Sequence, residues 1–230
     1  MRRPDAVQGT RRSLSHHHAD VIAPGVAIAS MALFAMLSVS VLEGEAAAFD
    51  SAVMAWTQSL HSPSLTAVMR LLTAMASALA LIPLALASAF VLIRRRQVPE
   101  GMSILISLAG SWVLNEVLKQ VFRRPRPPGP WLVDGPGYGF PSGHAMAATA
   151  FYGMVAYVLI RQLANRTWRC LAVFFSAVLI LLVAVSRVYL GVHYPTDVIA
   201  GIAAGSAWVS LCTIFRIPGG RNEDSDHQLR

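Results

Sequence analysis

Six long apolar stretches constrain this chain more than any other feature of its sequence. They cover Val21–Leu42, Leu71–Ile93, Met102–Leu118, Ala145–Ile160, Cys170–Val185 and Val198–Phe215. A helix needs about 20 predominantly apolar residues to cross a bilayer, and neutral flanking residues extend the shorter stretches toward that length. Because 55% of the residues are hydrophobic and 13% are charged, a soluble enzyme, a disordered chain and a nucleic-acid-binding protein are all disfavoured. The sequence predicts an all-α fold, a bundle of six transmembrane helices.

Basic residues set the expected orientation of that bundle. They occur in the N-terminal tail, at Arg94–Arg96, in the segment 161–169 and in the C-terminal tail, which share one side if all six stretches cross. The connection after the first stretch instead carries Glu43, Glu45 and Asp50. Since positive charge favours the cytoplasmic side, both termini are predicted to be cytoplasmic. We expect a cytoplasmic tail over 1–20, a six-span membrane domain over 21–215 and a second cytoplasmic tail over 216–230.

The first stretch has arginines before it and small residues after it, as a signal peptide does. It is too long for the apolar core of about 7–15 residues that a signal peptide contains, so we expect an uncleaved helix. The loop that follows contains Phe49, Val53, Trp56 and Leu60 at helical spacing. This stripe predicts a short amphipathic helix, which lies on the membrane surface, packs against the bundle, or does both.

One outer loop departs from the charge rule. It carries Lys119, the only lysine of the chain, together with Arg123, Arg124 and Arg126. A cationic cluster on the outer side indicates an anionic ligand. Polar residues are concentrated in three segments, each at the outer end of predicted helices: Lys119–Pro127, Pro141–His144 and Ser186–Asp197. We therefore place the active site at the outer ends of the helices.

The residue types in these segments suit phosphoryl transfer. Lys119, Arg126 and Arg187 can compensate the charge of a phosphate group, and helix N-termini near Ser142 and Gly143 offer free N–H groups to an anion. Ser142 also stands where a helix N-cap is expected. A carboxylate at Asp197 can orient the imidazole of His193 as a nucleophile, which leaves His144 as a general acid. Too few carboxylates lie in these loops for a binuclear metal site, so we expect no metal ion.

The pattern Lys-x6-Arg-Pro, Pro-Ser-Gly-His and Ser-Arg-x5-His-x3-Asp resembles that of the type 2 phosphatidic acid phosphatase (PAP2) family. This family comprises integral-membrane lipid phosphate phosphatases related at the site to vanadium-dependent haloperoxidases. The motif core spans 119–197, and the six-span layout extends the similarity over most of the chain. The resemblance implies that His193 forms a phosphohistidine, Asp197 orients it and His144 protonates the leaving alkoxide. The same resemblance implies phosphate contacts from Lys119, Arg126, Ser142, Gly143 and Arg187.

The expected function is metal-independent hydrolysis of a membrane lipid phosphate or diphosphate, with the bilayer as partner and without cofactor or nucleic acid. Undecaprenyl diphosphate is the first choice of substrate, and phosphatidylglycerophosphate, phosphatidate and lipid A phosphate remain alternatives. Phosphotransfer to another acceptor and non-catalytic lipid transport are alternatives from other classes, whereas a vanadate-using oxidase is disfavoured because the site is embedded in a membrane bundle.

Several residues outside the motifs have more local expectations. Glu116 is predicted to pair with Lys119 one helical turn away. Arg123 and Arg124 occupy non-motif positions, so we expect solvated or headgroup-facing charges. Pro83 is predicted to kink the second span. The glycines at 135, 137 and 139 predict either a lid over the site or a plain flexible loop.

Overall fold

The computed structural model describes the backbone of residues 4–215 and the side chains from Ile22 onward. All secondary structure in this part of the chain is helical, which confirms the all-α prediction. The helices are α1 (Pro4–Leu42), α2 (Ala47–Ser59), α3 (Pro63–Ala74), α4 (Ala78–Arg94), α5 (Val98–Phe122), α6 (Gly143–Gln162), α7 (Arg166–Tyr189) and α8 (Pro195–Ile214). The predicted C-terminal tail and the side chains of the predicted N-terminal tail lie outside the described part of the chain.

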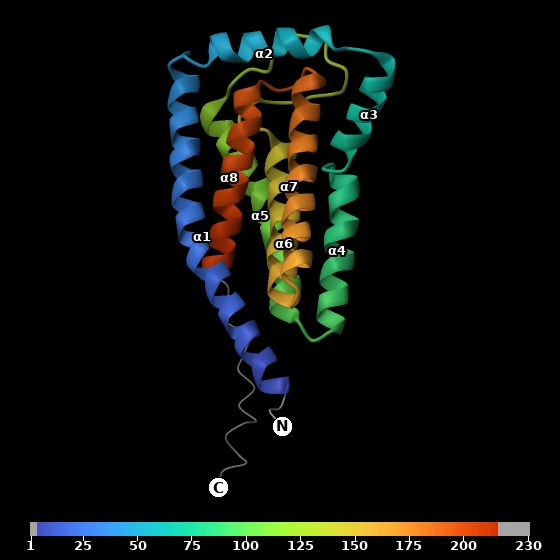
Figure 1. Ribbon diagram of the computed structural model, residues 1–230. Helices are drawn as coiled ribbons and strands as arrows, with labels where there is room; N and C mark the ends of the chain where they lie inside the picture. Colours follow the sequence, from blue (N-terminus) through green and yellow to red (C-terminus); the bar gives the residue numbers. More distant parts are fainter. Residues whose placement is uncertain (1–3, 216–230) are drawn as a thin grey trace.

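The long helices form a bundle, and α2 lies across one end of it (Figure 1). We call this the α2 end; it also carries the loop 123–142 and the turn between α7 and α8. The connections from α4 to α5 and from α6 to α7 lie at the opposite end. Helix α6 packs against α5, α7 and α8, and α1 packs against α8. Three segments far apart in sequence therefore meet at the α2 end.

Five helices of the described chain are long and apolar enough to cross a membrane, and a sixth span results if α3 and α4 count together. These two helices meet at a 42° bend. The bend lies at Met75–Ser77 and precedes Pro83, which stays inside α4. Each half begins with its own serine cap, since Ser62 Oγ accepts from Leu65 N and Ser77 Oγ accepts from Ala80 N. The predicted second span is therefore two capped helices.

Small residues let α8 approach α6 closely. A Cβ atom at Gly201 would stand 2.6 Å from the carbonyl oxygen of Ser142, and one at Gly205 would stand 2.8 Å from Thr149 Cβ. Real Cβ atoms do not approach other atoms this closely, so both positions require glycine in this packing. The contact brings the start of α6 against the start of α8. Ser142 N accordingly donates to the backbone oxygen of Asp197 at 2.9 Å.

Helix α2 presents two different faces. Asp50, Met54 and Thr57 are buried toward the bundle. Part of the apolar stripe predicted from the sequence lies on another face, where Phe49 is 51% exposed and Trp56 is 63% exposed, whereas Val53 packs beside Met54 against the bundle. The predicted packing on the bundle is confirmed, because α2 contacts it by a narrow face that includes a buried carboxylate. That the exposed apolar residues lie on a membrane surface stays a prediction.

Candidate active site

The residues predicted to bind and transfer phosphate gather at the α2 end of the bundle. Lys119 and Arg187 lie in the last turns of α5 and α7, and Ser142 immediately precedes α6. His144 is in the first turn of α6, and Asp197 is in the first turn of α8. Arg126 and His193 occupy the connecting loops. Helix ends thus hold most of the site in rigid positions, because each belongs to a helix that continues through the bundle.

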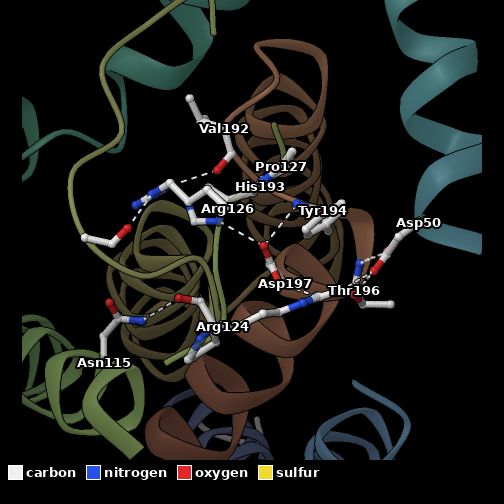
Figure 2. Close-up of polar contacts among 12 residues, drawn as sticks. Asp50, Asn115, Arg124, Arg126, Pro127, Val192, His193, Tyr194, Thr196 and Asp197 are labelled. Carbon is white, nitrogen blue, oxygen red and sulfur yellow. Dashed lines mark hydrogen bonds and ion pairs between the residues drawn. The ribbon is translucent and has the colours of Figure 1, made fainter. Parts of the chain in front are cut away.

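His193 and Asp197 face each other, although His193 precedes α8 and is not itself helical. His193 Nδ1 lies 3.4 Å from Asp197 Oδ2, close enough for an ion pair but without hydrogen-bond geometry. On its other side, His193 Nε2 lies 3.0 Å from Arg126 Nη1 (Figure 2). An arginine can only donate, so Nε2 must present its lone pair and Nδ1 must carry the proton. This tautomer is the one that a nucleophilic Nε2 requires.

The environment of His193 keeps its imidazole neutral. The pKa of His193 is lowered from 6.5 to about 4, mainly by burial and in smaller part by the nearby charges of Arg126 and Arg187. Asp197 acts in the opposite direction and offsets part of the effect. Since the folded protein disfavours the imidazolium, protonation begins only well below neutral pH. At neutral pH the ring therefore retains the lone pair with which it could attack phosphorus.

Arg126 is held by backbone oxygens on several sides. Its Nε donates to Gly137 O at 3.0 Å, Nη2 donates to Pro136 O at 2.9 Å and Nη1 donates to Val192 O at 2.8 Å. The glycine-rich segment at 135–139 therefore supports Arg126 through its backbone oxygens. This contact is a role that neither predicted alternative, a lid or a plain flexible loop, included. The bracing directs one amino group toward His193 Nε2.

Besides His193 Nδ1, two buried polar atoms of motif residues have no hydrogen-bond partner: Ser142 Oγ and Arg187 Nε. Ser142 occupies the predicted N-cap position, but its hydroxyl makes no capping bond. Arg187 is 4% exposed, and its Nη1 donates to Thr73 Oγ1 of α3 at 2.7 Å, which leaves Nε unused. Buried polar groups are normally satisfied, so this hydroxyl and this guanidinium N–H retain unused capacity to donate hydrogen bonds to the acceptor oxygens of an anion.

Lys119 approaches the start of α6. A Cβ atom at Gly143 would stand 3.8 Å from Lys119 Nζ and 2.9 Å from Asn115 Oδ1, so a larger residue at position 143 would displace the Asn115 side chain. Asn115 Nδ2 also donates to Pro141 O at 3.2 Å. The predicted pairing of Glu116 with Lys119 is not formed; Glu116 instead accepts a hydrogen bond from Gln120 at 2.9 Å. Among the residues with described side chains, Lys119, Arg126 and Arg187 make no ion pair.

Sequence reasoning missed a second group of residues that contact the predicted site. Arg124, expected to be a solvated charge, has only 14% of its side chain exposed and pairs with both Asp50 and Asp197. Thr196 completes the group through hydrogen bonds to Asp50 and Arg124 (Figure 2). The one available signal was Asp50 itself, an acidic residue at the start of an otherwise apolar amphipathic helix. Thr73, the partner of Arg187, had no signal in the sequence.

Comparisons with known proteins agree with this geometry. The PAP2 superfamily profile matches residues 100–218. Phosphatidylglycerophosphatase B of Bacillus subtilis (strain 168) is 32% identical over 173 residues, 75% of this chain and 85% of that protein. Undecaprenyl-diphosphatase of Sulfolobus acidocaldarius is 37% identical over 133 residues, 55% of this chain and 60% of that protein.

Solved structures give the same result. The crystal structure of the PAP2-type phosphatidylglycerolphosphate phosphatase from Bacillus subtilis superposes with a TM-score of 0.75 at 29% identity, covering 81% of this chain and 93% of that one. The structure of Aquifex aeolicus LpxE shares the fold, with a TM-score of 0.54 at 22% identity, over 69% of this chain and 92% of that one. The profile match covers more than half of the chain, and the chain belongs to the PAP2 superfamily as an integral-membrane lipid phosphatase.

Proposed function

We propose that this enzyme hydrolyses a lipid phosphate or diphosphate without a metal ion, through a phosphohistidine at His193. The observation that carries the proposal is the surroundings of that imidazole. It is buried and neutral, it faces a carboxylate through one nitrogen and a guanidinium through the other, and the nearby Ser142 Oγ and Arg187 Nε lack partners. A phosphoryl group placed there would supply acceptor oxygens to the cations and an electrophilic phosphorus to Nε2.

The proposed reaction has two steps. His193 Nε2 attacks phosphorus, the bond from phosphorus to the lipid-side oxygen breaks, and His144 donates a proton to that oxygen as it leaves. Water then attacks the phosphohistidine, His144 accepts its proton, and the phosphorus–nitrogen bond breaks to release inorganic phosphate. Lys119, Arg126, Arg187, Ser142 and the backbone at Gly143 stabilise the charge on the phosphoryl oxygens in both steps. Asp197 stabilises the positive charge that His193 acquires.

The proposed reaction uses no metal ion in either step. Both oxygens of Asp197 are engaged, Oδ1 by Arg124 and Oδ2 by Tyr194 N and the His193 ring. Three cations without carboxylate partners can carry out the charge compensation that a metal supplies elsewhere.

For the lipid, we propose undecaprenyl diphosphate. Lys119, Arg126 and Arg187 together bring three positive charges, which suit the higher negative charge of a diphosphate. The similarity to the Sulfolobus acidocaldarius undecaprenyl-diphosphatase supports this choice. Phosphatidylglycerophosphate is the second candidate, because the Bacillus subtilis relative named for that activity matches more of the chain. Under the first choice the leaving group in step one is the polyprenyl monophosphate.

A panel of lipids tests the proposal. The purified protein in detergent is incubated with undecaprenyl diphosphate, phosphatidylglycerophosphate, phosphatidate and a lipid A phosphate, each with and without a chelator, and released phosphate is measured. We expect the rate of phosphate release with chelator to stay within about two-fold of the rate without it. We expect the highest kcat/KM on undecaprenyl diphosphate. Activity that disappears with chelator and returns with added metal would contradict the metal-free chemistry. A higher kcat/KM on phosphatidylglycerophosphate would replace the first substrate with the second.

We further propose that the site faces the extracytoplasmic side of the membrane. The arginine-rich connections, 94–96 and 161–169, lie at the end opposite the site, and such charge favours the cytoplasm (Figure 1). A cysteine introduced for the exposed Trp131 at the α2 end should react with a membrane-impermeant maleimide in intact cells. A cysteine introduced for Arg95 should react only after the cells are permeabilised. The reverse pattern would invert the proposed orientation.

A further inference from the structure

Three charged side chains form a buried chain of contacts behind His193. Asp50 of α2 is 1% exposed, Asp197 of α8 is completely buried, and Arg124 from the loop after α5 lies between them. Arg124 Nη2 donates to Asp50 Oδ2 at 2.6 Å, and Nη1 donates to Asp197 Oδ1 at 2.5 Å. One guanidinium thus grips two carboxylates that come from helices distant in sequence.

The two carboxylate oxygens of Asp197 have different partners. Oδ1 takes the hydrogen bond from Arg124, while Oδ2 lies toward His193 Nδ1 and accepts from the backbone N–H of Tyr194 at 3.0 Å. With Oδ1 occupied, the carboxylate cannot rotate freely about its bond to the chain. The oxygen that faces the imidazole is therefore selected by the residue that binds the other oxygen.

Arg124 is itself fixed on several sides. Its Nη1 also donates to Thr196 Oγ1 at 2.8 Å, and its guanidinium lies 4.4 Å from the centre of the Tyr194 ring. The backbone oxygen of Arg124 accepts from Gly139 N at 2.8 Å, which ties it to the segment before the second motif. Burial alone lowers the pKa of Arg124, but Asp197 and Asp50 raise it by more, so the guanidinium remains charged.

Asp50 of α2 fixes both Arg124 and Thr196. Its Oδ1 accepts from Thr196 N at 3.0 Å, and its Oδ2 accepts from Thr196 Oγ1 at 2.7 Å as well as from Arg124. Asp50 therefore binds the residue directly before Asp197 and the arginine that grips Asp197. Burying three charges is costly unless each is well paired, and such networks are often retained because they specify one arrangement.

We propose that Arg124 is a positioning residue for Asp197, and that Asp50 acts through Arg124 to hold it in place. The pair keeps Asp197 Oδ2 directed at His193 Nδ1 and so maintains the tautomer in which Nε2 carries the lone pair that attacks phosphorus. Neither residue is one of the specified residues of the three motifs, and neither contacts the phosphoryl group in this assignment. The inference rests on the proposed role of His193. It also gives α2 a function, because the helix that presents an apolar stripe to its surroundings carries one end of the network.

The test compares Arg124→Met with Arg123→Met. Arg123 is the adjacent, exposed arginine, whose Nε bonds the backbone oxygen of Gln120, so the control removes the same charge from the same loop. We expect kcat to fall about 100-fold in Arg124→Met, while KM stays within about three-fold of the wild-type value. Losses of this size are typical when a residue that orients a catalytic side chain is removed. Inhibition by inorganic phosphate should stay within about three-fold, since Lys119 and Arg187 remain. Arg123→Met should retain kcat within about two-fold.

Two further variants separate positioning from folding. Arg124→Lys keeps the charge but not the fork that reaches two carboxylates, and it should recover no more than about ten-fold of the lost kcat. Asp50→Asn preserves the shape of the side chain and should lower kcat about ten-fold, against no more than two-fold for the exposed Asp134→Asn. In the Arg124→Met background, Asp50→Asn should have no additional effect on kcat.

The outcomes distinguish this inference from the proposed function. An inactive His193 variant together with a normal kcat in Arg124→Met or in Asp50→Asn would overturn the positioning role alone. A parallel loss of phosphate inhibition and kcat in Arg124→Met would indicate general damage to the site and would likewise overturn it. If Arg124→Met does not fold, the comparison of Asp50→Asn with Asp134→Asn decides the question. A wild-type protein that releases no phosphate from any lipid would instead overturn the proposed function.

Discussion

Replacing His193 with glutamine is expected to lower kcat by about 10⁴-fold or more, because the covalent intermediate is assigned to its Nε2. Glutamine is polar and similar in length, so it fills much of the buried space and limits collapse of the surrounding loop. Substrate binding should change little, since Lys119, Arg126 and Arg187 are retained. The measurement is steady-state phosphate release from the preferred lipid, with the melting temperature in detergent as a check of folding.

His61→Gln is the matched control. His61 lies between α2 and α3 at the same end of the bundle, is exposed, and bonds the backbone oxygen of Tyr189 through Nε2. Its described contacts are with Tyr189 and with none of the motif residues, so kcat should stay within about two-fold of wild type. A His193→Gln protein that melts normally and keeps more than about one-hundredth of the wild-type kcat would contradict the assignment of the nucleophile.

Arg187→Met is expected to cause the next largest loss, about 10³-fold in kcat. Removing one donor to the charge that develops in a transition state typically costs 10²–10³-fold, and Arg187 also contributes a full positive charge in a buried position. Methionine occupies a similar volume without a charge. Its main cost to the fold is the loss of the hydrogen bond to Thr73 Oγ1.

Two companions make the Arg187 result specific. Arg187→Lys keeps the charge without the planar fork and should recover about ten-fold of the lost kcat. Thr73→Val removes the partner while the guanidinium remains, and kcat should fall only a few-fold. A loss in Arg187→Met smaller than about ten-fold, with normal folding, would show that Lys119 and Arg126 suffice to stabilise the phosphoryl oxygens.

The bundle could be predicted because its signals are local and repeated. Hydropathy over about 20 residues identified the membrane-spanning stretches. The second span was harder, because Leu71–Ile93 is apolar throughout and hydropathy does not register a helix break. The cap at Ser77 that ends the continuity is a single residue in a run of alanines and methionine, a signal too weak to locate a 42° bend.

The site shows the same contrast between short-range and long-range information. Motif spacing brought His193 and Asp197 together because they are four residues apart. Asp50 and Thr196 are 146 residues apart in the chain, and the hydrogen bonds between them follow only from the packing of α2 onto the start of α8. Arg124 occupies an unspecified position within the first motif, so the sequence predicts only a solvated charge there. Its burial depends on carboxylates from two distant helices, which no local pattern indicates.

The most direct test of the central claim is to trap the covalent intermediate. The enzyme is mixed with lipid substrate carrying ³²P in the phosphate to be transferred, quenched with alkali within the first turnover, and examined for labelled protein. The account predicts a label that is stable to alkali, labile to acid, mapped to the peptide containing His193 and missing in His193→Gln but present in His61→Gln. A wild-type enzyme that completes the turnover with no labelled protein at any quench time, or with a label on another residue, would contradict it.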